Sequence, residues 1–209
     1  MIPEEQLTGT YVRLRPLTVD DAEAIHSAFA DASPELFTYM SFAPFESVGD
    51  VLEVSRFMLG EADWSPYVVE VDGTIEGFEA YLRINPLDGV IEIGSIMFSP
   101  RLQRTTAATE SAYLLMRHAF ESGYRRVEWK CDDLNAPSRR AGERLGFRHE
   151  GTFLNATHYK GRNRDTAWFA MTVEDWAGHR PTFEAWLNES NFDQSGGQIR
   201  SLSDLRQSG

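Results

Sequence analysis

One stretch of the chain constrains the fold more than any other, because two apolar strands flank a single helix. Residues 90–98 form an apolar run that a Ser-Pro pair closes. From 105 to 121 the apolar residues fall on one helical face, and residues 126–131 return to a strand pattern. A crossover through one helix joins strands that run parallel. The sequence therefore predicts a parallel pair of strands in the central sheet.

The remaining strand patterns predict antiparallel neighbours for that pair. Residues 67–71 and 75–84 are separated by an Asp-Gly pair, a typical hairpin turn. The turn at 85–89 then leads back into the strand at 90–98. We therefore predict an α/β (α+β) fold with a mixed, mostly antiparallel central sheet flanked by helices, and not a doubly wound sheet.

The N-terminal third has a strand, a helix and an aromatic segment. Residues 11–15 alternate like a strand, and Thr18 with Asp21 indicates a helix start. We expect that helix to stop at the Ser-Pro pair at 33–34, because proline disfavours helical backbone before it. The stretch to about residue 62 is loosely helical, and its aromatic residues either pack in the core or line a substrate pocket. Its aromatic and methionine residues are Phe37, Tyr39, Met40, Phe42, Phe45, Phe57 and Met58.

The C-terminal part continues with a helix over 137–145, closed by Gly146. Two strands, from Phe147 onward and over 166–173, are joined through residues 160–165.

The last helix is expected over 174–187, and it completes a single domain over residues 1–187. Residues 188–209 are rich in Ser, Gln, Gly and Asn, which predicts a mobile polar tail.

Composition restricts the classes of partner. The net charge is -12, whereas nucleic-acid binding needs a basic surface, so no nucleic-acid partner is expected. This acidity either attracts amines or simply keeps the protein soluble. The absence of 18 consecutive apolar residues, and of a signal-peptide pattern over 1–6, predicts no membrane association. Cys131 is the single cysteine, which fits a reducing, cytoplasmic compartment, and we interpret it as a buried strand residue rather than a nucleophile.

The loop between the 90–98 strand and the following helix can bind an anion. Backbone N–H groups at a helix N-terminus lack acceptors and carry the positive end of the helix dipole. The residues there are small enough for a phosphate to approach the backbone, and they are Thr105, Thr106, Ala107 and Ala108. Arg101 and Arg104 add positive charge.

This loop resembles the pyrophosphate-binding segment of the GCN5-related N-acetyltransferases (GNAT), Gln/Arg-x-x-Gly-x-Gly/Ala. Gln103 and Ala108 match its ends, and Thr106 stands where the central glycine is usual. The run from Leu102 to Glu110 is similar to a threonine-containing variant in the RimJ/RimL-like branch.

Other segments, in the same order as in that branch, extend the resemblance over about residues 7–176. They are Ile91-Glu92-Ile93-Gly94, Asn135-Ala136-Pro137-Ser138, Arg144-Leu145-Gly146-Phe147, Glu150-Gly151, and Gly161-Arg162 with Asp165.

The resemblance implies acetyl-CoA as acyl donor and no metal. Its pantetheine arm would enter a splay between the parallel strands at 91–98 and 126–131. Backbone amides of Ile96, Met97 and Phe98 would hold the thioester carbonyl, where negative charge develops during transfer. The pyrophosphate would lie on the amides of Gln103, Arg104, Thr105, Thr106, Ala107 and Ala108.

Glu92 is the candidate general base, because a partly buried carboxylate beside the splay can have a raised pKa. The alternative is a carboxylate that faces solvent or pairs with an arginine. Glu79 and Glu110 are further candidate carboxylates, and His158 and Tyr159 are candidate bases or substrate contacts.

The resemblance also assigns Asn135 to the cofactor and Ser138 to protonation of the leaving thiolate. Asn135 is equally suited to capping the helix that follows, and the two roles do not exclude each other. Ser138 could instead hydrogen-bond the thiolate, or simply be a polar residue of the first helical turn.

These expectations describe an N-acyltransferase that moves an acetyl group from acetyl-CoA to a primary amine by direct attack in a ternary complex. The acceptor is either a protein N-terminus or a small molecule. A non-catalytic CoA-binding regulatory module of the same fold is the alternative, and a simple interaction protein is a third. The sequence is compatible with a homodimer and leaves the acceptor, the acyl group and the oligomeric state open.

Overall fold

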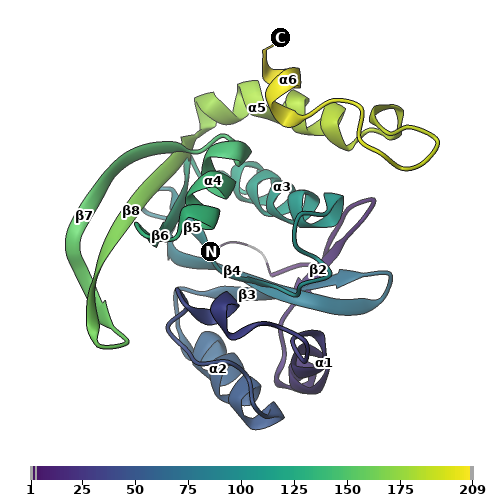
Figure 1. Cartoon of the computed structure of the whole chain (residues 1–209). Helices are drawn as coiled ribbons and strands as arrows, with labels where there is room; N and C mark the ends of the chain where they lie inside the picture. Colours follow the sequence, from purple (N-terminus) through teal and green to yellow (C-terminus); the bar gives the residue numbers. More distant parts are fainter. Residues whose placement is uncertain (1, 3, 208–209) are drawn as a thin grey trace.

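The computed structural model describes residue 2 and residues 4–207, and one eight-stranded sheet runs through it (Figure 1). The strand order is β1-β2-β3-β4-β5-β6-β8-β7. The strands are β1 (Leu7–Thr8), β2 (Arg13–Pro16), β3 (Ser65–Val71), β4 (Thr74–Asn85), β5 (Val90–Phe98), β6 (Arg126–Asp132), β7 (Arg148–Tyr159) and β8 (Arg162–Thr172). Neighbouring strands of the described chain are antiparallel except β5 and β6, which run parallel. The predicted mixed, mostly antiparallel sheet is confirmed.

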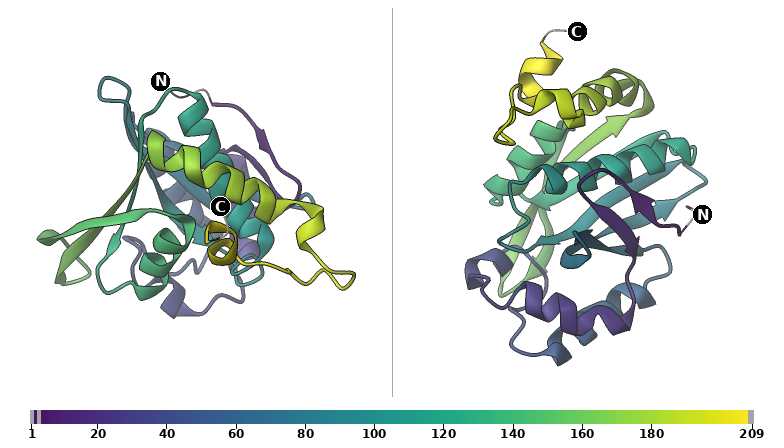
Figure 2. Two further views of the ribbon diagram at one scale, coloured as in Figure 1. Left: turned by 90° about the horizontal axis from the view of Figure 1, so that it is seen from above. Right: turned by 90° about the vertical axis from the view of Figure 1, so that its right-hand side faces the viewer.

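Helices cover both faces of this sheet (Figures 1 and 2). On one face lie α1 (Ala22–Ala28) and α2 (Val48–Gly60), and on the other lie α3 (Thr106–Glu121), α4 (Ala136–Leu145), α5 (Val173–Leu187) and α6 (Leu202–Arg206). The short 3-10 helices are η1 (Val19–Asp21), η2 (Pro34–Phe37) and η3 (Glu189–Asn191).

Alternation along the strands supplies a separate apolar core to each layer. Val68, Phe78 and Met97 pack with α1 and α2, whereas Tyr67 and Ile91 belong to the core beneath α3. Successive side chains of a strand point to opposite faces, so one strand contributes to both cores.

The N-terminal helix differs from the prediction. Thr18 and Asp21 do form a capping box, but the box begins η1, and α1 then ends at Ala28. The Ser-Pro pair at 33–34 starts η2 instead of ending a helix, because the Ser33 side chain accepts a hydrogen bond from the Glu35 amide. A proline in the first turn of a helix loses no hydrogen bond.

The aromatic segment before β3 belongs mainly to the core. Phe37, Phe42 and Phe45 pack against one another, and Phe42 and Phe45 also pack against Phe78 of β4. Phe57 is 55% exposed, so the segment also contributes to the surface.

The hairpin of β7 and β8 is longer than predicted. Its turn is Lys160-Gly161 alone, both with positive φ (48° and 74°), the conformation that suits a two-residue hairpin turn. Residues 162–165, expected in the connection, therefore belong to β8. The hairpin projects well beyond the rest of the sheet (Figure 1).

The parallel pair separates partway along its length. Residues are paired from Val90 with Arg126 to Ile93 with Trp129, and no further, although β5 continues to Phe98 and β6 to Asp132. The predicted splay between these strands is therefore present.

The C-terminal segment packs on the domain. Leu202 of α6 is buried, and Asn191 donates to carbonyl oxygens of Trp186 and Arg200. Arg206 of α6 donates to the carbonyl oxygen of Arg144 at the end of α4. The mobility expected of residues 188–209 stays a prediction, and residues 208–209 lie outside the described part. Residues 1 and 3, which belong to the segment 1–6 considered for a signal peptide, also lie outside it. Among the helices of that part, none combines the length and apolarity that crossing a bilayer requires.

Candidate active site

The loop between β5 and α3 is shaped by its own hydrogen bonds. Ser99 accepts from the amides of Leu102 and Gln103, and the Gln103 side chain donates to the carbonyl oxygen of Phe98. Arg104 has a left-handed backbone with φ of 63°. Arg101 is exposed but forms an ion pair with Glu76 of β4 at 2.9 Å, whereas Arg104 is exposed and forms no ion pair among the described residues.

The N-terminus of α3 leaves backbone donors available. The Thr105 hydroxyl accepts from the Ala108 amide at 3.1 Å and so caps the helix. Among the described residues, the N–H groups of Arg104, Thr106 and Ala107 have no acceptor. These free donors at the positive end of a 16-residue helix form a site for an anion such as a pyrophosphate.

The second part of β5 offers backbone groups beside the splay. Met97 and Phe98 pair with β4 on one edge, while the opposite edge has no strand neighbour after Ile93. A bulge lies between these regions, because Glu79 of β4 faces two residues of β5, Ser95 and Ile96. The Met97 side chain is buried against α1 and α2, so at this residue of the predicted thioester-binding segment only the backbone can serve a ligand in the splay.

Asn135 and Ser138 lie at the start of α4, next to the end of β6. The Asn135 side-chain oxygen Oδ1 accepts from the Ser138 backbone N–H at 3.1 Å, which shows the capping role considered for it. The Asn135 side-chain nitrogen Nδ2 has no acceptor in the described chain and remains able to donate to a ligand. The Ser138 hydroxyl accepts from the Trp129 indole at 3.1 Å, which leaves its own proton to donate.

Cys131 shares this neighbourhood but is not activated. Burial raises the pKa of its thiol, and the nearby Ser138 hydroxyl offsets this only in part. A buried thiol of raised pKa is a poor nucleophile.

Glu92 lies on the sheet face opposite α3, and it is 4% exposed. Its Oε2 atom is 2.9 Å from the Lys130 ammonium and 3.9 Å from Nε of Arg83. Burial raises the pKa of Glu92, although the charges of Lys130 and Arg83 oppose that effect. Both cations also lie 4.7 Å from the centre of the Trp168 ring.

Two of the other candidate side chains, those of Glu110 and Tyr159, have evident partners. Glu110 accepts the backbone N–H groups of residues 10, 11 and 12, so it fastens the β1–β2 turn to α3. Tyr159 donates to Asp132, and burial together with that carboxylate raises the pKa of Tyr159 to about 12. His158 is exposed on β7.

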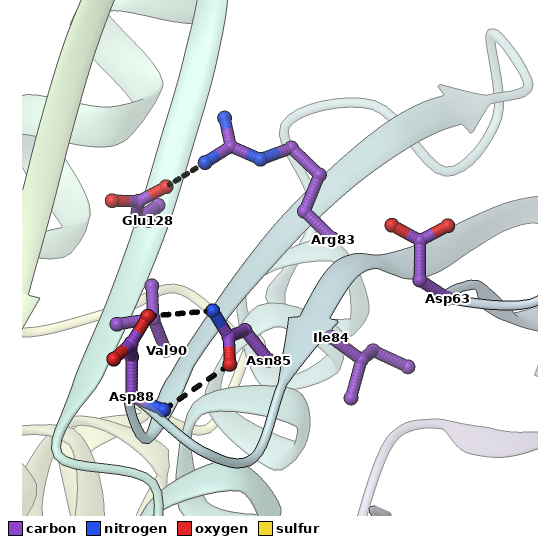
Figure 3. A pocket seen from close by; sticks show the side chains of 7 residues that line it. All are labelled: Asp63, Arg83, Ile84, Asn85, Asp88, Val90 and Glu128. Carbon is purple, nitrogen blue, oxygen red and sulfur yellow. Dashed lines mark hydrogen bonds and ion pairs between the residues drawn. The ribbon is translucent and has the colours of Figure 1, made fainter.

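A cavity of about 510 Å³ lies next to Glu92 and shares Arg83 with it (Figure 3). It is lined by Asp63, Arg83, Ile84, Asn85, Asp88, Val90 and Glu128. Arg83 extends to Glu128 across the cavity at 3.3 Å. The carboxylates outnumber the single arginine, so the lining is acidic.

Two hydrogen bonds link the segment between α1 and α2 to the β7–β8 turn and to the connection between β6 and α4. Lys160 at the tip of the β7–β8 hairpin donates to the Phe37 carbonyl oxygen at 2.7 Å. The Tyr39 hydroxyl donates to the Leu134 carbonyl oxygen at 3.0 Å.

Sequence reasoning missed Arg83, Lys130 and Trp168, the residues that surround Glu92. The alternation of β6 could have indicated Lys130, but the bulge that turns Arg83 toward Glu92, with φ of 50°, leaves no local sequence signal.

A mixed sheet with one parallel pair, parted beside a helix N-terminus that has free amides, defines an acetyltransferase of the GNAT fold. The chain belongs to this family, since residues 12–148 match the model described as Acetyltransferase (GNAT) domain. No group of three or more potential metal ligands occurs among the described residues.

Known proteins of this family resemble the chain over most of its length. A GCN5-related N-acetyltransferase from Brucella melitensis has a TM-score of 0.94 and 37% identity, with 98% of this chain and 95% of that chain covered. The uncharacterized N-acetyltransferase YnaD of Bacillus subtilis (strain 168) is 30% identical, over 81% of this chain and 98% of its own. Mycobacterium smegmatis RimJ in complex with CoA-disulfide shares the fold, with a TM-score of 0.72 and 21% identity over 82% of this chain and 89% of that chain.

Proposed function

We propose that the protein transfers an acetyl group from acetyl-CoA to a primary amine, by direct attack within a ternary complex. The observation that carries this proposal is the gap between β5 and β6, which opens next to the free amides of α3. One extended ligand with a pyrophosphate at one end and a thioester at the other suits both features. The RimJ structure of similar fold was solved with CoA-disulfide.

The donor half of the site provides hydrogen bonds and little else. Within residues 103–108, the free amides of Arg104, Thr106 and Ala107 bind the pyrophosphate, and the Arg104 side chain adds positive charge. The backbone of residues 96–98 polarises the thioester carbonyl, which gains negative charge as the amine attacks. Asn135 donates its free amide to the pantetheine arm, while its oxygen continues to cap α4.

The acceptor approaches from the face of the sheet that carries Glu92. Glu92 takes a proton from the acceptor ammonium, directly or through water, and the neutral amine then attacks the carbonyl carbon. The carbon–sulfur bond breaks, and the sulfur leaves as a thiolate that Ser138 hydrogen-bonds or protonates. The nitrogen gives up its second proton in the same step, and that proton balances the one that the sulfur or Ser138 takes up. Positioning of the two substrates supplies a large share of the rate.

The acidic cavity beside Glu92 favours an acceptor with positive charge, in accord with the net charge of -12. A protein N-terminus and a small-molecule amine both meet this requirement. The RimL protein, which is similar in fold, is described as a ribosomal L7/L12 alpha-N-protein acetyltransferase. We therefore include N-terminal peptides among the acceptors to be tested.

Two measurements test the proposal. Calorimetry with CoA should show saturable binding, and a thiol-release assay with acetyl-CoA and a panel of small amines and N-terminal peptides should identify an acceptor. Failure to bind CoA at millimolar concentration would overturn the proposal. Binding of CoA without thiol release for any acceptor would instead support the non-catalytic regulatory module.

A further inference from the structure

Three consecutive residues of α3 have buried polar side chains that bind three different elements. The Thr109 hydroxyl accepts from Arg144 of α4 at 3.1 Å, and Glu110 accepts amides of the β1–β2 turn. The Ser111 hydroxyl donates to Oε1 of Glu79 on β4 at 2.5 Å. The helix whose N-terminus provides the anion site is thus fixed by polar contacts from three directions.

Glu79 is the member of this set that packing alone does not explain. Glu79 is 0% exposed, and within the described chain its Oε2 atom has no hydrogen-bond partner. A buried carboxyl with an unsatisfied oxygen costs more than an apolar side chain of the same size. A carboxyl in this position therefore calls for a role beyond filling space.

The position of Glu79 connects the two halves of the donor site. It stands opposite the bulge of β5, where Ser95 has a left-handed backbone with φ of 50°. The bulge consists of Ser95 and Ile96. A bulge redirects the strand that contains it, so this one sets the course of residues 96–98. The same carboxyl is bound to Ser111, in the second turn of α3. Glu79 therefore faces the β5 bulge with its backbone and binds α3 with its side chain, so one residue links the strand beside the splay to the helix that offers free amides.

The surroundings of Glu79 are polar but uncharged. Tyr67 stands opposite it on β3, Tyr81 lies two residues further along β4, and Ser111 lies above it on α3. Burial raises the pKa of both tyrosines, so neither ionises near neutral pH. Tyr81 donates to the Leu115 carbonyl oxygen of α3, with His118 beyond it, and burial lowers the pKa of His118. Burial also raises the pKa of Glu79 to about 7.

We propose that Glu79 is a positioning residue for acyl-CoA: it fixes the spacing between the β5 bulge and the N-terminus of α3 while it is protonated, and releases that spacing when it ionises. The reason is that a buried carboxylate without a charged partner must acquire water, and the contact between Glu79 of β4 and Ser111 of α3 has to open to admit it. This inference rests on the proposed function, because it assumes that CoA occupies both halves of the donor site.

Calorimetric titration of the full-length protein with CoA tests the coupling. Glu79→Met and Ser111→Ala should each weaken CoA binding about tenfold, since each removes one side of a buried hydrogen bond. The double variant should bind no more weakly than Glu79→Met, because the partners act as a unit. Tyr113→Phe is the matched control, since it removes a hydrogen bond from the same helix to Glu184 of α5, away from β4.

The pH dependence of CoA binding distinguishes a positioning role of Glu79 from a role in stability alone. For the wild type, the dissociation constant for CoA should rise about tenfold between pH 6 and pH 8 relative to Glu79→Gln, which cannot ionise. The phosphates of CoA also titrate near pH 6, but they affect both proteins equally.

Two outcomes would overturn the inference. One is parallel pH profiles for the wild type and Glu79→Gln. The other is a wild-type CoA affinity in Ser111→Ala, with only a lower melting temperature. Absence of CoA binding by the wild type would instead remove the proposed function, so the two failures are distinguishable.

Discussion

The ammonium group of Lys130 lies 2.9 Å from the carboxylate of Glu92, on neighbouring strands just before they separate. This pair gives the proposed base two opposing influences, since burial favours its protonated form and the lysine favours its ionised form. An acceptor ammonium can compete with Lys130 for the same carboxylate. The site therefore holds a buried carboxyl group of raised pKa, next to the gap between β5 and β6.

Replacing Glu92 with glutamine should lower kcat by roughly 100-fold or more, because the attacking amine would lose its proton acceptor. Affinity for CoA should change little, since Glu92 lies on the opposite face of the sheet from α3. Steady-state kinetics and calorimetry measure the two quantities. Glu150→Gln, which alters an exposed carboxylate paired with Arg126, is the control. An unchanged pH–rate profile in Glu92→Gln would exclude Glu92 as the base.

Replacing Lys130 with methionine should shift the acidic limb of the kcat/KM profile to higher pH. Burial already raises the pKa of Glu92, and loss of the nearest cation removes an effect that lowers it, so a higher pH is needed to ionise the base. Methionine retains the contact with the Trp168 ring. Arg83→Met should shift the limb less, because its nitrogen is 3.9 Å from Glu92. A shift to lower pH in Lys130→Met would contradict this account.

Thr106→Glu should weaken CoA binding by roughly 100-fold, because it places a carboxylate beside the free amides that would receive the pyrophosphate. Thr106→Gly restores the residue that is usual in the family and should bind CoA about as well as the wild type. Calorimetry compares the three proteins. Tight binding by Thr106→Glu would show that the loop is not the pyrophosphate site.

Substitutions of Asn135 can separate its two roles. Asn135→Ala should lower the free energy of unfolding by about 1 kcal/mol, because the start of α4 loses its cap. Asn135→Asp keeps the capping oxygen, so its melting temperature should match the wild type, but it removes the free N–H donor. A raised KM for acetyl-CoA in Asn135→Asp would establish the cofactor contact, and wild-type kinetics would leave capping as the only role.

The stability of the protein should depend on the ionisation of Glu79. Its pKa is raised from 4.5 to about 7 in the folded state, so the folded state holds the proton more tightly. The contribution of this proton to the free energy of unfolding is fully present below pH 4.5, is lost as the pH rises toward 7, and changes no further above that. The change amounts to roughly 3 kcal/mol. Chemical denaturation of the wild type and Glu79→Gln at pH 5 and pH 8 measures it, and equal differences at both pH values would contradict the expectation.

Local patterns predicted the donor side of the site well. The strand at 90–98 and the helix start at Thr105 are where the apolar periodicity and the capping residue indicated them. Both signals lie within a few residues of chain, so neighbouring residues determine them.

The acceptor side depends on register, which local patterns do not contain. Lys130 meets Glu92 because β5 and β6 pair in one register, and Arg83 meets it because a bulge interrupts β4. Glu110 bonds residues about 100 positions earlier in the chain, and no spacing rule connects them. The sequence therefore could not predict which residues pair with Glu92.

The parting of β5 and β6 has a mechanical consequence. Four residue pairs join the two parts of the sheet directly. Because α3 contacts β1, β5 and β6, this helix holds the two half-sheets together where β5 and β6 no longer pair. The N-terminus of the same helix offers the free amides. An anion held there is therefore sensitive to the distance between the two half-sheets, and the half-sheets in turn are sensitive to whether that anion is bound.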